Sequence, residues 1–89
     1  MKTLRLSTHA RRNYKRIFRT DRRLFDRLDK SLSRLLDQPE IGKPLVGPLE
    51  GHRSLQVGHL RIIYRIEPSR DEVLILDISP RGGAYQGCR

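Results

Sequence analysis

Three closely spaced segments with the pattern of β-strands occupy the second half of the chain, and they constrain its fold most. These segments are "RSLQV" (53–57), "LRIIYRI" (60–66) and "EVLILDI" (72–78), joined only by the short connections "VGHL" and "EPSRD". Connections this short join neighbouring antiparallel strands. The sequence therefore predicts a three-stranded antiparallel meander, and the third segment, apolar on both faces, is expected to be central.

Two helices are predicted before the meander. A short alternating segment, "KTLRLS", is expected to be a first strand, and Ser7 or Thr8 then caps a helix with an apolar stripe. Thr20 or Asp21 can cap a second helix, which ends at Pro39 in "DQPE". So few residues separate the two helices that they should form an antiparallel hairpin. The apolar stripes are Ala10, Tyr14, Ile17 and Phe18 in the first helix, and Leu24, Phe25, Leu28, Leu32, Leu35 and Leu36 in the second.

The expected fold class is α+β, with the element order β-α-α-β-β-β. In this arrangement the helical hairpin packs on one face of a small, mostly antiparallel, twisted sheet. The segment "IGKPLVGPLEG" (41–51) contains three glycines and two prolines and is expected to be a loop. A chain of 89 residues is expected to form one domain, residues 1–89.

The charge is strongly positive and concentrated in the predicted helices. The chain has 19 Lys and Arg against 10 Asp and Glu, a net charge of +9, and residues 1–38 hold 12 of the basic side chains but only four of the acidic ones. Arginine predominates, and its guanidinium binds phosphate with two hydrogen bonds. This balance favours a nucleic acid or an acidic protein as partner rather than a membrane. The alternative is a helix face that is merely solvated.

Several other classes of protein are disfavoured. No run approaches the ~20 apolar residues of a membrane span, and "MKTLRLSTHARR" lacks the apolar core of a signal peptide, so a cytoplasmic location is expected. Cys88 is the single cysteine, which rules out an internal disulfide. His9, His52 and His59 have no ligand spacing to one another. No metal and no cofactor is expected.

The order of motifs resembles the RelE/ParE superfamily, the toxins of type II toxin–antitoxin systems. The stretch "GKPLVGPLEGHRSLQVGHLRIIYRI…VLILDISPRGGAY" is similar to the family's "GKPL…L.G..S.RVG.YRIIY.I" block, its "V.IL.I" strand and its Arg-containing tail ending in Tyr. The resemblance covers essentially the whole chain, and its central block is the specific part. RelE-like members cut mRNA in the ribosomal A site, whereas ParE-like members inhibit DNA gyrase. The fold alone does not decide between these activities.

The resemblance implies a metal-independent nuclease site. In such cleavage the ribose 2′-OH attacks the phosphate, which needs a base, an acid and cationic donors. Arg61 aligns with an arginine that holds the scissile phosphate, Arg81 with a tail arginine that acts as general acid or clamp, and Tyr85 with a tyrosine that orients or stacks on a base. Alternation along 60–66 places Arg61 on the face opposite the apolar residues.

Two departures from the family pattern leave the general base unidentified. The RelE-type lysines fall near Ser54 and Gln56, and the position before Arg81 is Pro80. Arg53 and His59, with His52, are the nearby replacements, and a histidine with an ordinary pKa of ~6.5 can act as base or acid. The alternatives are a His59 that only fills an exposed turn, an Arg61 paired with Glu67 or Asp77, and a Tyr85 that only packs.

Two binding surfaces are expected besides the catalytic residues. The basic helix face should make sequence-independent contacts with mRNA and ribosomal RNA; its residues are Arg11, Arg12, Lys15 and Arg16, with Arg65 on the sheet. The far side of the sheet, with Ile63, Val73 and Ile75, is expected to bind a cognate acidic antitoxin in a hetero-oligomer, and operator DNA only through it. The alternative is that the helices or a dimer mate cover this face.

The function expected from the resemblance is a ribosome-dependent mRNA endoribonuclease with Arg61 and Arg81 central. One alternative is a ParE-like gyrase inhibitor, which would act through the helical hairpin and tail rather than through Arg61. The other is a degenerate toxin that retains only antitoxin and operator binding. Ser54, Gln56 and Pro80 keep that alternative open.

Overall fold

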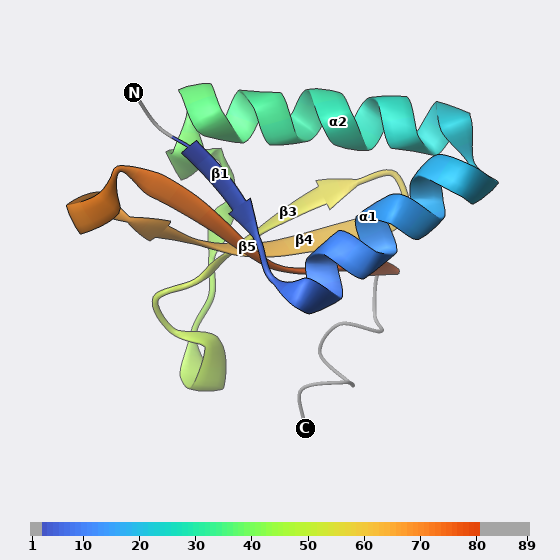
Figure 1. Ribbon diagram of the computed structural model, residues 1–89. Helices are drawn as coiled ribbons and strands as arrows, with labels where there is room; N and C mark the ends of the chain where they lie inside the picture. Colours follow the sequence, from blue (N-terminus) through green and yellow to red (C-terminus); the bar gives the residue numbers. More distant parts are fainter. Residues whose placement is uncertain (1–2, 81–89) are drawn as a thin grey trace.

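A five-stranded mixed sheet and two helices make up the structure, a computed structural model that describes residues 3–80. The strand order is β1-β5-β4-β3-β2, and α2 lies over one face of the sheet (Figure 1). This arrangement confirms the predicted α+β class. The elements are β1 (Thr3–Leu6), α1 (Thr8–Thr20), α2 (Arg22–Asp37), β2 (Lys43–Pro44), β3 (Arg53–Val57), β4 (Leu60–Glu67) and β5 (Glu72–Pro80), with 3₁₀ turns at Pro39–Ile41, Gly47–Leu49 and Pro68–Arg70.

The predicted meander is present, and two more strands extend it. β3, β4 and β5 pair antiparallel, while β1 pairs parallel with β5, placing Leu4 opposite Val73 and Leu6 opposite Ile75. β5 therefore lies inside the sheet, between β1 and β4, as its apolar sequence indicated. β2, within the stretch expected to be a loop, pairs with the start of β3 as a two-residue edge strand.

Each helix begins after one of its two predicted capping residues. Ser7 Oγ accepts a hydrogen bond from the Ala10 amide at 3.1 Å, and Asp21 Oδ1 accepts one from the Leu24 amide at 3.0 Å. Ser7 also donates to the carbonyl of Leu76 at 2.7 Å, which ties the start of α1 to β5. The first turn of α1 is thereby fixed beside the end of the sheet.

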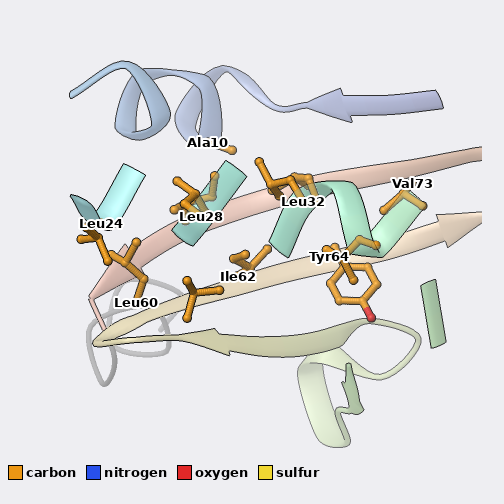
Figure 2. Packing of buried hydrophobic residues seen from close by; sticks show 12 residues of the cluster. Ala10, Leu24, Leu28, Leu32, Leu60, Ile62, Tyr64 and Val73 are labelled. Atoms are coloured by element: carbon orange, nitrogen blue, oxygen red, sulfur yellow. The ribbon is translucent and has the colours of Figure 1, made fainter. Parts of the chain in front are cut away.

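The core lies between α2 and the face of the sheet that it covers (Figure 2). α1 adds the fully buried Ala10, but Phe18, predicted in its apolar stripe, is 43% exposed. The Phe18 ring packs edge-on against Phe25 at 5.0 Å, with the Arg22 guanidinium 4.2 Å from its centroid. The core residues include Leu24, Leu28, Leu32 and Leu35 of α2, Leu60, Ile62 and Tyr64 of β4, and Val73, Ile75 and Ile78 of β5.

The hydroxyl of Tyr64 joins this core to the chain that follows α2. It donates to the carbonyl of Pro39 at 2.6 Å and accepts from the amide of Gly42 at 2.9 Å. A Cβ at Gly42 would collide with this hydroxyl, so the position requires glycine. Burial raises the pKa of Tyr64.

The prediction that Ile63, Val73 and Ile75 together form a face that binds an antitoxin is wrong. Val73 (Figure 2) and Ile75 are fully buried in the core, and Ile63, on the other face, is only 3% exposed. The cause is a bulge: Ile63 lies opposite Asp77 but Tyr64 lies opposite Ile75, so β5 has one additional residue at Leu76. The side chains of β5 therefore switch faces at the bulge. Because the residues on both sides of the bulge are apolar, the sequence pattern does not reveal this switch.

We expect Tyr64→Phe to lower the free energy of unfolding by about 1–3 kcal/mol, because the variant leaves a buried carbonyl and amide without a partner. Urea unfolding followed by circular dichroism measures this. Tyr14→Phe is the matched control, since the Tyr14 hydroxyl donates only to the exposed Asp29, and its loss should stay within about 0.5 kcal/mol. Equal losses in the two variants would contradict the role given to the Tyr64 hydroxyl.

The raised pKa of Tyr64 also predicts a pH dependence of stability. Because desolvation holds the proton on the folded protein above the ordinary pKa of 10.0, this contribution is complete below about pH 10 and is lost as the pH rises through the raised value. The free energy of unfolding of the wild type should therefore fall more steeply between about pH 9 and 11 than that of Tyr64→Phe. Parallel curves for the two proteins would refute the prediction.

Candidate active site

Arg61 lies on the face of the sheet turned away from α2. It sits in β4 between the buried Leu60 and Ile62, so its side chain leaves on the opposite face, as predicted. Gln56 of β3 and Ser79 of β5 are its direct neighbours across the strands. The residue is half-buried and its Nε atom is buried, so the stem of the side chain is held by the sheet. We call this surface the outer face; it carries Gln56, Arg61, Ile63, Arg65, Asp77 and Ser79.

A chain of polar contacts reaches the outer face from α1. Nε2 of His9 lies 2.7 Å from Oδ1 of Asp77, and Ser79 Oγ donates to the other carboxylate oxygen of Asp77 at 2.8 Å. Asn13, one turn after His9, donates to the carbonyl of Ile78 at 2.7 Å. The sequence analysis considered His9 only as a metal ligand and did not connect it with Asp77. Only the parallel pairing of β1 with β5 brings these distant residues together, and no local pattern signals it.

His59 and Arg16 line a common cavity of about 210 Å³ between α1 and the ends of β4 and β5. His59 is exposed in the turn that joins β3 to β4, while Arg16 comes from the second half of α1. Ser79 also lines this cavity, which therefore adjoins the outer face. The structure thus brings one predicted catalytic residue next to one predicted RNA-binding residue.

Arg53 lies away from Arg61, on the inner face of the sheet. It pairs in register with the core residue Tyr64, and its guanidinium Nη1 donates to the carbonyls of Gly42 at 2.9 Å and Glu40 at 3.3 Å. The expectation that Arg53 joins Arg61 in one site is wrong, because the period of two in β3 sends it to the other face. Arg53 instead holds the turn after α2 against the sheet.

A second basic cluster lies beside the start of α1. Arg11 and Arg65, both predicted to bind RNA, line one groove of about 750 Å³ together with Arg5 and Arg70. Two carboxylates in the groove offset part of its charge: Arg65 pairs with Glu67, and Arg5 Nη1 lies 3.5 Å from Glu72. Arg12 and Lys15 are exposed elsewhere on α1. Glu67, one of the two carboxylates named as alternative partners of Arg61, is paired with Arg65.

Two predicted catalytic residues cannot be placed. Arg81 and Tyr85 lie outside the described residues, and their roles stay predictions. Pro80, the residue before Arg81, pairs with Leu60, the residue before Arg61. Over residues 3–80 there is no group of three His, Cys, Asp or Glu side chains that could hold a metal ion, and no helix long and apolar enough to cross a membrane.

A family model described as "ParE toxin of type II toxin-antitoxin system, parDE" matches residues 4–85, nearly the whole chain. The chain belongs to the RelE/ParE superfamily of toxins. This is the family that the central block of the sequence resembles. Its members are toxins of type II toxin–antitoxin systems.

Individual relatives carry the names of several branches of this superfamily. Toxin RelE of Mycobacterium tuberculosis is 38% identical over 53 residues, 58% of this chain and 55% of that protein, so the chain spans about half of that relative's length. The toxin–antitoxin complex RelBE2 of M. tuberculosis contains a chain 31% identical, with a TM-score of 0.75 and coverage of 89% of this chain and 96% of that one. A YoeB/ParE toxin from Agrobacterium tumefaciens has a TM-score of 0.81 over 91% and 99% of the two chains, but at 22% identity this likeness shows the fold alone.

Arg53→Ala is expected to lower the free energy of unfolding by about 1–3 kcal/mol, because hydrogen bonds from a charged donor to two carbonyls are lost. Denaturant midpoints measure the effect. Arg34→Ala, which removes an exposed arginine of α2, is the matched control and should change stability by less than about 0.5 kcal/mol. If the Arg53→Ala protein were as stable as the wild type but no longer toxic, Arg53 would instead belong to the active site.

Proposed function

We propose that this toxin is a ribosome-dependent mRNA endoribonuclease that cleaves without a metal, by attack of the ribose 2′-OH on the adjacent phosphate. The observation that carries the proposal is the position of Arg61. It is an arginine on an interior strand, with a buried stem, whose neighbours across the strands are the polar Gln56 and Ser79. A fixed guanidinium on an open sheet face can bind a phosphate and stabilise the negative charge that grows during attack.

The residues beyond β5 would complete this site. Arg81 follows Pro80 in the chain, and Pro80 pairs with Leu60 beside Arg61. The alignment of Arg81 with the family's tail arginine supports a second arginine at the same phosphate. Tyr85 would then stack on or orient a base of the splayed mRNA. The RelE name of the M. tuberculosis relative also supports this assignment.

The basic groove beside α1 supports binding of a nucleic acid larger than the cleaved nucleotides. Arg11 and Arg65 line it with Arg5 and Arg70, and Arg12 and Lys15 extend the positive surface along α1. Contacts of this kind to phosphates do not depend on sequence and weaken as salt rises. They suit mRNA held on the ribosome and the ribosomal RNA around it. Such a target implies action in the cytoplasm.

A cognate acidic antitoxin is the second partner that we propose. The homologous chain of M. tuberculosis was solved as a toxin–antitoxin complex, and a net charge of +9 favours an acidic binding segment. Since Val73 and Ile75 are buried, this segment would have to bind elsewhere than on these two side chains. Operator DNA would then be bound only through the antitoxin.

A gyrase inhibitor of the ParE type is the alternative function. The family model bears the ParE name, and the helical hairpin exposes an aromatic surface suited to a protein partner. Tyr14, Phe18 and Phe25 line an open apolar groove there, and the two phenylalanines pack at 5.0 Å. This activity would depend on the hairpin and not on Arg61. A degenerate toxin is the third candidate, because the outer face carries neutral Gln56 near a position where RelE-type members have lysine.

The experiment that separates these functions is induced expression with mapping of mRNA 5′ ends on translating ribosomes. Arg61→Ala should lower the cleavage rate by about 100-fold or more, as loss of one transition-state donor does, while Arg34→Ala should cleave like the wild type. Growth arrest with intact mRNA and broken or relaxed DNA, unchanged by Arg61→Ala, would establish the gyrase alternative. Absence of any toxicity in the wild type would support the degenerate toxin.

A further inference from the structure

The proposed nuclease lacks a general base among the positions where its family would supply one. The outer face holds Gln56 directly beside Arg61, and arginine itself stays protonated at all relevant pH values. His59 is exposed in a turn and lines the cavity beside α1. Within residues 3–80, a residue that reaches the outer face from outside the meander is therefore the next candidate for the base.

His9 is such a residue, and its surroundings are those of a catalytic imidazole. Its side chain is 62% exposed, yet it contacts the largely buried carboxylate of Asp77, which is 15% exposed. Nε2 lies 2.7 Å from Oδ1 of Asp77, while Ser79 holds Oδ2 at 2.8 Å. Oδ1 is buried and accepts no well-directed hydrogen bond, and Nδ2 of Asn13 lies 3.4 Å from the same Nε2 atom of His9. A buried carboxylate oxygen in this position would stabilise positive charge on the imidazole.

The register of the sheet places this pair beside Arg61. Ser79 is the direct partner of Arg61, and Asp77 is the partner of Ile63, two residues further along β4 on the same face. Side chains directly opposite in an antiparallel pair have Cβ atoms about 5 Å apart, and long side chains reach the diagonal neighbours as well. A phosphate bound by Arg61 would thus lie next to the imidazole that Asp77 holds.

We propose that His9 is the general base of the cleavage reaction, an inference that rests on the nuclease function proposed for this toxin. With Nε2 against Asp77, Nδ1 is the nitrogen left to meet the substrate. Nδ1 takes the proton of the ribose 2′-OH, O2′ bonds to phosphorus, and the bond from phosphorus to O5′ breaks. The products are a 2′,3′-cyclic phosphate and a 5′-OH, whose proton comes from water.

Asp77 acts in this scheme as a positioning residue, and Ser79 fixes the orientation of its carboxylate. Asp77 sets which imidazole nitrogen meets the substrate and stabilises the imidazolium that forms, the role a carboxylate has beside histidine in other catalytic sites. Among residues 3–80, Arg61 lies opposite Ser79 on β4, and Arg12 lies at i+3 from His9 on α1. Both carry a fixed charge, so neither can accept the proton of the 2′-OH.

The test is single-turnover cleavage of ribosome-bound mRNA between about pH 5 and 8.5, where a histidine changes charge. His9→Ala and the closer isostere His9→Gln should lower the rate constant by about 100-fold or more and remove the rise of rate with pH. Added imidazole should restore part of the rate to His9→Ala. Asp77→Asn should be slow as well, and His9→Ala/Asp77→Asn should be no slower than His9→Ala, because Asp77 acts through His9.

Ser7→Ala is the matched structural control, since it removes the hydrogen bond that ties the start of α1 to the carbonyl of Leu76 and leaves the His9 side chain in place. Its rate should stay close to that of the wild type. If His9→Gln cleaves like the wild type while Arg61→Ala does not, His9 is not the base and the nuclease function stands. If Ser7→Ala loses as much activity as His9→Ala, without rescue of the latter by imidazole, His9 only anchors the helix. A wild type that leaves ribosome-bound mRNA intact would overturn the nuclease function and this inference together.

Discussion

The pairing of β5 with strands on both sides is the constraint on which the rest of the structure depends. Its parallel partner β1 ends at Leu6, and the Ser7 amide then donates to the carbonyl of Ile75 at 2.9 Å. The chain thus enters α1 directly beside the second half of β5. This geometry brings the first turns of α1 to Asp77 and Ile78. One strand therefore supplies core residues on one face and polar residues of the candidate site on the other.

The bulge at Leu76 makes this double use of β5 possible. Without an additional residue, strict alternation from Val73 and Ile75 would place Asp77 in the core and Ile78 outside. With it, Ile78 is fully buried and Asp77 reaches the outer face opposite Ile63. A buried unpaired carboxylate would cost several kcal/mol, which explains why the strand changes phase there. Bulges commonly redirect side chains next to active sites in this way.

The sequence could predict those features that depend on residues close together in the chain. The caps at Ser7 and Asp21, both helices and the two faces of β4 follow from residues a few positions apart, and these predictions are confirmed. The position of Arg53 could also have been predicted, because it alternates in phase with the apolar Leu55 and Val57. The phase of β5 could not, since both its faces are apolar. The contact of His9 with Asp77 joins residues 68 positions apart and depends on the fold as a whole.

The charge composition of the outer face has a consequence for any chemistry there. A RelE-type site with lysines on β3 would contain groups whose pKa values burial can lower toward neutrality. Here β3 has Ser54 and Gln56 on this face, and β4 has arginines, which do not lose their protons. Lys43, in register with Ser54, is exposed on the edge strand β2. Arginines can bind a phosphate and stabilise charge, but they cannot accept the proton of a 2′-OH. Proton transfer at this face must therefore come from the few titratable groups that touch it. Among those within residues 3–80, the imidazole of His9 is exposed, while Glu67 is paired with Arg65 and Asp77 is mostly buried.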